Sequence, residues 1–276
     1  MAEVRRLPPP QPGPVVLVIL DGWGLAHPNR GNAVTLAKTP VMDALYQRFP
    51  HTRLEASGPA GGLPVGQPGN SEAGHLNIGA GRIVTQDAVK ISRAINTGSF
   101  FKNAAFARAL AHVRRRRSAL HLMGLLSNEA SAHACPDHLY ALLTLVRRYR
   151  VKRVYLHLFT DGRDSPPHAG LKLLNALMRV LKDELIATVI GRFYAMDRKK
   201  DWTRTLLAYD AMVSGSGLSA ASPQAAITES YNRNESDEFI PPYVVRRRGH
   251  PVGAIDHGDA IVLFNLRSDR ARQLAK

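Results

Sequence analysis

Cysteine is almost absent from the sequence: Cys135 is the single one in 276 residues. One thiol cannot form a disulfide within the chain, which excludes a disulfide framework and favours a cytoplasmic location. Long apolar runs are also missing, since no stretch approaches the roughly 18 residues that a membrane-spanning helix needs. The first residues carry two arginines but no apolar segment or cleavage site behind them, so we interpret residues 1–14 as a Pro-rich leader and not as a signal peptide.

Acidic residues are scarce as well. The sequence has 22 Asp and Glu against 37 Lys and Arg, which gives a net charge of +15. Part of this charge lies in basic runs at residues 114–117, 147–153 and 246–248. Such an excess indicates an anionic partner, which is nucleic acid, a membrane surface or a small phosphorylated or carboxylated substrate. Composition alone does not choose among the three.

Short apolar runs alternate with amphipathic helical patterns along the chain. The length predicts one large domain or two smaller ones. Helices are predicted over residues 103–117, 138–150 and 169–183. Buried strands are predicted over residues 14–20, 119–127, 153–160, 185–191 and 260–266. The alternation predicts the α/β class, with a parallel sheet covered by helices on both faces in a three-layer arrangement.

Charged residues follow the predicted strands at the point where each one ends. Ligands of open α/β sheets bind outside the carboxyl ends of the strands, so these residues are candidates for one binding site. An arginine fork fits carboxylate and phosphate oxygens two at a time, and Asp164 is placed to orient a hydroxyl or act as a base. Any single arginine is equally well explained as a solvated or ion-paired surface residue. The presence of several arginines just past strand ends is not well explained in this way. The candidates are Asp21, His133, Asp161, Arg163, Asp164, Arg192, Arg198, Arg267 and Arg270.

A glycine-rich stretch, QPGNSEAGHLNIGAGR at residues 67–82, contains Ser71. Glycines let the backbone approach a phosphate closely, and a helix N-terminus after them would favour its negative charge. Ser71 is therefore a candidate nucleophile, with a helix-capping serine as the alternative. His75 follows four residues later, on the same side of a helix if one forms there. Asp21 is either a ligand for a hard cation or a turn residue in DGWG.

Six motifs occur in one order along the chain and together resemble a known family, the cofactor-independent phosphoglycerate mutases of the alkaline phosphatase superfamily. The resemblance extends from Val15 to Gln273, and it corresponds to the N-terminal portion of that family. The motifs are VLVILDGWG, GLPVGQPGNSEAGHLNIGAGRIV, FTDGRDSPP, GRFYAMDRKKDWTR, ESYNRNESDEFIPP and FNLRSDRARQ.

The resemblance implies an isomerase of glycolysis that interconverts 3-phosphoglycerate and 2-phosphoglycerate without bisphosphoglycerate. Ser71 would take the phosphoryl group as a phosphoserine intermediate. Two Mn²⁺ ions (or Mg²⁺ or Co²⁺) would act on it, with Asp21 and Ser71 among their ligands. A small-molecule substrate is implied, and we expect a monomer with no nucleic-acid or membrane partner. The substrate-binding residues implied are His133, Arg163, Asp164, Arg192, Arg198, Arg267 and Arg270.

The sequence departs from the family pattern in two places. Around the substrate-binding histidine the family usually reads like SDGGVHSH, whereas this chain reads SNEASAHAC, with His133 in the histidine's place after one extra residue. The family also continues beyond the last motif and supplies further metal ligands there, whereas this sequence ends at Lys276. We therefore expect the chain alone to be inactive. Residues 1–84 would form the N-terminal part of an incomplete metal-binding phosphatase domain, and residues 85–276 a phosphotransferase domain short of its last elements.

Two other functions stay open on the sequence. The first is a non-catalytic protein that still binds phosphoglycerate. The second is a basic nucleic-acid-binding protein, indicated by the net charge of +15. Against the second, the runs at 114–117 and 147–150 close amphipathic helices, where cations suit the helix dipole, and no basic stretch is interleaved with aromatic residues.

Overall fold

The computed structural model describes residues 13–128 and 131–276. The Pro-rich leader predicted for the first residues lies, up to residue 12, outside this part. The chain divides into two compact units, a first unit of residues 1–54 and a second unit of residues 55–276. This division falls 30 residues before the domain boundary predicted at 84/85. Residues 55–84 belong to the second unit because they bond to it, for example through the Gln86 N–H and the Gly62 carbonyl at 2.9 Å. The assignment of the two domains by function stays a prediction.

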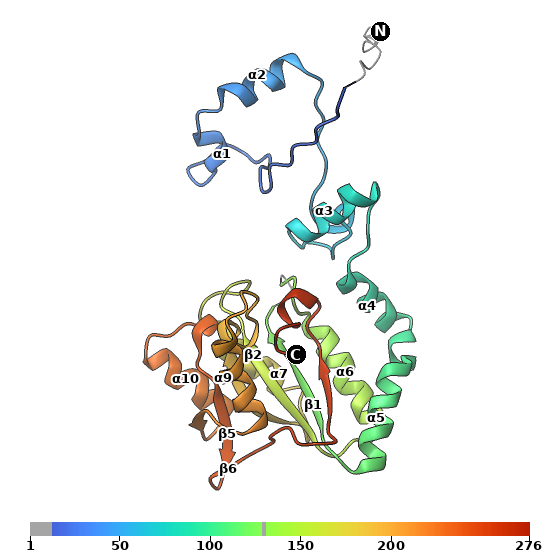
Figure 1. The fold of residues 1–276 in the computed structure, drawn as a ribbon, viewed down its shortest axis with the longest axis vertical. Helices are drawn as coiled ribbons and strands as arrows, with labels where there is room; N and C mark the ends of the chain where they lie inside the picture. Colours follow the sequence, from blue (N-terminus) through green and yellow to red (C-terminus); the bar gives the residue numbers. More distant parts are fainter. Residues whose placement is uncertain (1–12, 129–130) are drawn as a thin grey trace. The chain divides into compact units, whose positions relative to one another are not determined.

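The first unit contains two short helices, α1 (Ala33–Leu36) and α2 (Pro40–Arg48), and no strand among its described residues (Figure 1). The strand predicted over residues 14–20 is therefore wrong for this structure. The segment is extended but unpaired, and Val15 at its start is 97% exposed. A strand needs a neighbouring strand for its backbone groups, and the described part of this unit offers none.

The second unit is built on a seven-stranded sheet in the order β4-β5-β3-β2-β1-β7, with β6 paired to β5 (Figure 1). The pairs are parallel except those of β5 with β3 and with β6, so the prediction of an α/β fold on a mostly parallel sheet is confirmed. The strands are β1 (Leu120–Leu126), β2 (Val154–Thr160), β3 (Leu185–Gly191), β4 (Leu218–Ala220), β5 (Tyr243–Arg247), β6 (His250–Pro251) and β7 (Ala260–Leu263).

Helices precede and connect the strands of the second unit. The side chain of Asn103 accepts the Ala105 N–H at 2.9 Å and caps α5, as the sequence predicts. The helix predicted over residues 169–183 is shorter than expected, since α7 ends at Met178. No helix of the described residues is long and apolar enough to span a membrane. The helices are α3 (Ser71–Ala80), α4 (Asp87–Asn96), α5 (Ala104–Arg116), α6 (Pro136–Arg148), α7 (Gly170–Met178), α8 (Arg192–Ala195), α9 (Trp202–Val213) and α10 (Pro223–Asn232).

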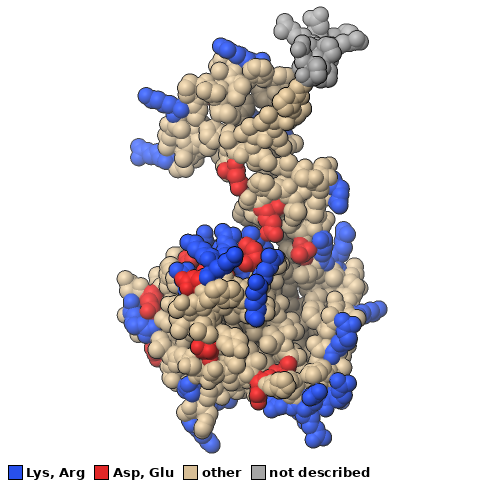
Figure 2. All heavy atoms as spheres, viewed as in Figure 1, with Lys and Arg blue, Asp and Glu red and all other residues tan. Residues whose placement is uncertain are grey.

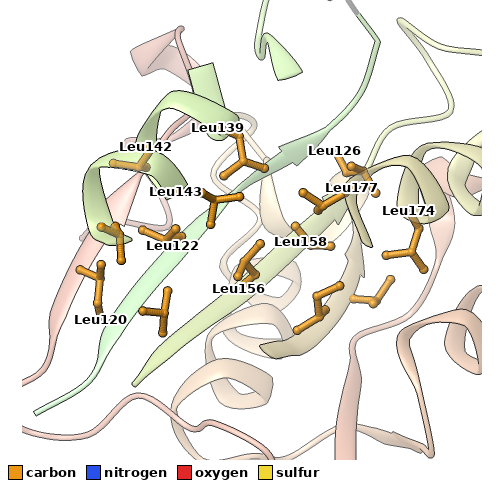
Figure 3. Packing of buried hydrophobic residues seen from close by; sticks show 14 of the residues in the cluster. Leu120, Leu122, Leu126, Leu139, Leu142, Leu143, Leu156, Leu158, Leu174 and Leu177 are labelled. Atoms are coloured by element: carbon orange, nitrogen blue, oxygen red, sulfur yellow. The ribbon is translucent and has the colours of Figure 1, made fainter. Parts of the chain in front are cut away.

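Two hydrophobic clusters cover the two faces of the sheet. Alternate residues of β1 point to opposite faces, so Leu122 joins one cluster and Met123 the other. Figure 3 shows the first cluster, in which Leu139 and Leu143 of α6 lie over the leucines of the strands. The second cluster packs α9, through Met212, against the other face. Each fully buried leucine stabilises the fold by about 2 kcal/mol, which is why nearly continuous apolar strands form a sheet in the middle layer.

A row of hydrogen-bonded polar side chains runs across β1, β2 and β3 on the face of the sheet that carries the second cluster. The Asp259 carboxylate lies 3.1 Å from His121 Nε2, His121 Nδ1 lies 2.9 Å from His157 Nε2, and His157 Nδ1 lies 3.0 Å from the Thr188 hydroxyl. Because a carboxylate only accepts, each histidine donates from Nε2 and accepts at Nδ1, and the Thr188 hydroxyl donates. Both imidazoles are neutral in this arrangement. Burial lowers the pKa of both histidines, that of His157 to about 3.

Candidate functional site

Asp161 stands at the end of β2 and holds the loop that follows it. The side chain is buried, and it accepts the backbone N–H groups of residues 163–165 at 3.1 to 3.3 Å. The Ser127 hydroxyl, just past β1, donates to the same carboxylate. Gly162 allows the sharp turn because its φ is +66°, a conformation that residues with a side chain rarely adopt. The loop that carries Arg163 and Asp164 is thus fixed by one buried carboxylate.

Arg192 begins α8 directly after β3 and brings the third strand into the same site. Its buried guanidinium lies 2.5 Å from Asp161 and 3.2 Å from Asp164. Asp164 also accepts the Ser131 hydroxyl at 2.8 Å. Burial on its own would raise the pKa of Asp164, but Arg192 and the Ser131 hydrogen bond outweigh it and lower this pKa. Asp164 is therefore an ionised carboxylate whose remaining lone pairs can accept a hydroxyl.

His133 lies in the same place, buried beside these charges. Burial, and then the charge of Arg192, lower its pKa to about 4, so the imidazole is neutral near pH 7. Its Nδ1 is buried and has no hydrogen-bond partner among the described residues. Buried nitrogens of this kind are rarely left unpaired, so Nδ1 is a candidate to bind a group that reaches it. The structure thus places His133 where the sequence expects it, next to Asp164 and Arg192.

Four of the predicted arginines share one pocket of about 310 Å³. Arg198 pairs with Asp269 at 3.3 Å, and Arg163 lies 3.8 Å from Glu238. Burial lowers the pKa of Arg270, and the nearby guanidiniums of Arg198 and Arg192 lower it further. Guanidiniums that repel one another in a recess form a site for a small, multiply charged anion. The pocket is lined by Arg163, Arg192, Phe193, Met196, Asp197, Arg198, Lys199, Arg204, Glu238, Phe239 and Arg270.

Arg267 does not line this pocket. Its guanidinium forms ion pairs with Glu72 at 2.7 Å and with Asp269 at 3.2 Å. Glu72 follows Ser71 in the chain, so the pair joins the glycine-rich segment to the loop after β7. Arg267 therefore contacts the neighbourhood of Ser71, whereas the other four predicted arginines gather in the pocket.

Ser71 is the first residue of α3 and is exposed. The capping role falls to Asn70, whose side chain accepts the Ala73 N–H at 3.0 Å, so the alternative that Ser71 itself caps the helix is wrong. His75 lies on the same side of α3, with Nδ1 3.3 Å from the Ser71 hydroxyl. That nitrogen is only 2.7 Å from the Ser71 carbonyl, to which it donates, so it cannot take a proton from the hydroxyl in this arrangement.

The predicted metal ligands belong to different units. Asp21 lies in the first unit and Ser71 in the second, and both side chains are exposed. Across residues 13–128 and 131–276 no group of three or more His, Cys, Asp and Glu side chains could hold a metal ion.

Several residues of the site carried no clear signal in the sequence. Asp269 binds two arginines and Glu238 approaches a third, yet each is an ordinary charged residue in its motif. Arg204 lines the pocket from α9, with its guanidinium 3.9 Å from the Phe193 ring. Arg204 is the last residue of the motif GRFYAMDRKKDWTR, but the motif does not show that its side chain meets the pocket. Asp161 does have a signal, since an Asp-Gly pair directly after a strand is typical of a tight turn.

Comparisons with known proteins agree with the motifs. The family model described as BPG-independent PGAM N-terminus (iPGM_N) matches residues 91–276. The chain belongs to this family. It is 50% identical over 266 residues to the 2,3-bisphosphoglycerate-independent phosphoglycerate mutase of Moorella thermoacetica, covering 95% of this chain and 52% of that protein. The enzyme of the same name from Chloroflexus aurantiacus is 52% identical over 270 residues, covering 96% of this chain and 50% of that protein.

A solved structure matches the fold as well. The phosphoglycerate mutase of Leishmania mexicana, crystallised at low cobalt concentration, aligns with a TM-score of 0.80 and 32% identity. The alignment covers 87% of this chain and 46% of that one. The chain spans about half the length of the curated relatives that it matches. The resemblance to the N-terminal portion of this family is therefore confirmed.

Proposed function

We propose that this chain binds phosphoglycerate and carries the phosphoryl-accepting serine of a bisphosphoglycerate-independent phosphoglycerate mutase. The observation that carries the proposal is the pocket of about 310 Å³ lined by Arg163, Arg192, Arg198 and Arg270. Phosphoglycerate bears a phosphate and a carboxylate, and each matches the fork of a guanidinium. The names of the relatives support the same activity for this family.

The roles of the residues follow from their surroundings. The arginines hold the two anionic groups, and the unpaired Nδ1 of neutral His133 contacts an oxygen-bound hydrogen of the substrate. In the first step the Ser71 hydroxyl oxygen attacks phosphorus and gives up its proton to solvent, the bond from phosphorus to the substrate oxygen breaks, and that oxygen takes up a proton from solvent to give glycerate. In the second step the other glycerate hydroxyl attacks phosphoserine, and Ser71 recovers a proton. Asp164 is placed to orient the glycerate hydroxyls.

A metal is part of the proposal only through the family resemblance. Two Mn²⁺, Mg²⁺ or Co²⁺ ions are the expected group, and Asp21 and Ser71 are the ligands that this chain offers. They lie in different units, and no step above is derived through a metal. The expected inactivity of residues 1–276 alone, the monomeric state and the cytoplasmic location also stay predictions.

Phosphate on Ser71 tests the transfer step. The protein from the full coding sequence, incubated with 3-phosphoglycerate and Mn²⁺, should gain one phosphoryl group on the peptide that contains Ser71, as measured by mass spectrometry. Ser71→Ala should abolish it, because no other group replaces the hydroxyl. Ser214→Ala is the control, since Ser214 is an exposed serine at the end of α9. Mutase turnover by Ser71→Ala would contradict the transfer step, whereas a wild-type protein that binds 3-phosphoglycerate but gains no phosphate on Ser71 would leave the non-catalytic alternative.

Substrate binding by the chain itself is tested by calorimetry. Arg198→Ala should weaken 3-phosphoglycerate binding by about 10- to 100-fold, because a charge-assisted hydrogen bond contributes roughly 1.5–3 kcal/mol. Arg198 suits the test because its side chain is 53% exposed and, in the described part of the chain, its ion pair is with Asp269 alone. Arg179→Ala, an exposed arginine after α7, is the control and should leave the affinity unchanged. Equal weakening by both variants would mean non-specific charge attraction.

A further inference from the structure

A second basic recess lies at the amino ends of β1 and β2, at the opposite end of these strands from the arginine pocket. It is a groove of about 470 Å³ between the ends of α5 and α6. Five of its lining side chains are cationic, and none is acidic or aromatic. We call it the basic groove; its polar lining residues are Arg114, Arg117, Ser118, Arg150, Lys152 and Arg153.

The basic groove is separate from the arginine pocket. Its residues precede the strands, with Ser118 just before β1 and Arg153 directly before β2, whereas the pocket residues follow strand ends. Strands β1 and β2 are parallel and seven residues long, so the two recesses lie at least about 20 Å apart along the strands. Figure 2 shows blue side chains gathered at the lower right of the second unit, where α5 ends in Figure 1.

The cations of the basic groove are not neutralised. Within the described residues none of the five forms an ion pair, although most arginines of the other site do. Asp259, a carboxylate at the same edge, is held by the Ala119 N–H at 2.6 Å and by His121, and it does not line the groove. Five like charges in one recess repel one another, and a bound polyanion removes that repulsion.

The backbone gives a second, independent indication. Arg117 and Arg150 follow α5 and α6 with φ of +53° and +56°, in the left-handed region where glycine is the usual residue after a helix. A side chain there costs about 1 kcal/mol, yet both positions carry a cation. The helix dipole favours cations within the last turn, but it does not account for Lys152 and Arg153, which lie beyond α6.

We propose that the basic groove binds a linear oligophosphate. Consecutive phosphoryl groups present oxygens on all sides, which suits cations that converge from two helix ends. The volume lies in the range of small-ligand pockets, and a concave site does not fit a flat membrane surface. No aromatic ring lines the groove for a base to stack on, which favours a phosphate chain over a nucleic acid. The Ser118 hydroxyl, buried without a partner among the described residues, is a further donor at its base.

The test is calorimetry with sodium tripolyphosphate. The variant Arg117→Gly/Arg150→Gly removes two charges and keeps the fold, because glycine suits both positive φ values. It should weaken tripolyphosphate binding by about tenfold or more, since charged hydrogen bonds are lost. Lys152→Gln removes one charge at an exposed position without introducing a glycine. It should also weaken tripolyphosphate binding.

Two controls locate the ligand. Arg248→Gly removes one positive charge from a turn with φ of +52° outside the basic groove, and it should leave the affinity unchanged. Arg179→Ala, at an exposed arginine after α7 that lines neither recess, should also leave it unchanged. Full affinity in Arg117→Gly/Arg150→Gly would overturn the proposal, as would orthophosphate binding as tightly as tripolyphosphate. An RNA oligonucleotide that binds more tightly and is weakened by the same variant would replace the oligophosphate with nucleic acid.

Discussion

Asp161→Ala is expected to lower the free energy of unfolding of the second unit by about 3–5 kcal/mol. The change leaves the guanidinium of Arg192 buried without its closest carboxylate, which lies 2.5 Å away in the native structure. It also leaves three backbone N–H groups of residues 163–165 and the Ser127 hydroxyl without their acceptor. Urea unfolding followed by circular dichroism measures the difference.

Two variants separate the buried charge from the loss of a side chain. Asp161→Ala/Arg192→Met removes both members of the ion pair, so it should recover much of the lost stability. Asp183→Asn, at an exposed carboxylate, should change the free energy of unfolding by less than about 0.5 kcal/mol. If Asp161→Ala proves no more destabilising than Asp183→Asn, Asp161 does not hold the loop and the carboxyl edge in the way described.

Acidification is expected to remove several kcal/mol of stability, beginning near pH 6.5. The pKa of His157 is lowered to about 3 by burial and then by His121, whereas the unfolded chain titrates near 6.5. Between these values the unfolded state binds the additional proton, so the free energy of unfolding falls by about 1.4 kcal/mol per pH unit for this one group as the pH falls. The full effect of His157 approaches about 5 kcal/mol at pH 3.

The contribution of the histidines to the pH dependence of stability is best measured between about pH 5 and 6.5. In this range Asp and Glu of the unfolded chain are still largely ionised, so they contribute little to the slope. In this window the slope of the wild type also includes His121, His133 and His138, whose pKa values are lowered by burial as well. His157→Gln should reduce the slope by about one proton, whatever its absolute stability. His250→Gln, at an exposed position on β6, should leave the slope unchanged. Parallel curves for wild type and His157→Gln would contradict a buried neutral His157.

The sequence predicts the central strands of the sheet well, but it does not predict the strands at the β4 edge. β1, β2 and β3 are covered on both faces, so they read as continuous apolar runs. The sequence does not predict β4 or β5, because neither contains such a run. β4 has three residues, and β5 ends in two arginines. The segment at residues 14–20 has the apolar run but no partner strand among the described residues, which no local pattern reveals.

The candidate site divides in the same way. The rule that ligands bind past the carboxyl ends of parallel strands selects Arg163, Asp164 and Arg192 from the sequence, and the structure brings them together. The same rule does not separate Arg267, which turns to Glu72, from Arg270, which enters the pocket. The difference depends on the directions of two side chains in one short loop. The hydrophobic periodicity of the sequence does not predict side-chain directions in a loop.

The carboxylates beside the strand-end arginines have a consequence for how a ligand enters. Arg198 rests on Asp269, Arg163 lies near Glu238, and Arg267 rests on Glu72. Under the proposed function, binding of phosphoglycerate would therefore be an exchange, in which the phosphate or carboxylate of the ligand replaces Asp269 or Glu238 as the partner of an arginine. In the pocket without a ligand, these carboxylates offset part of the repulsion among the guanidiniums.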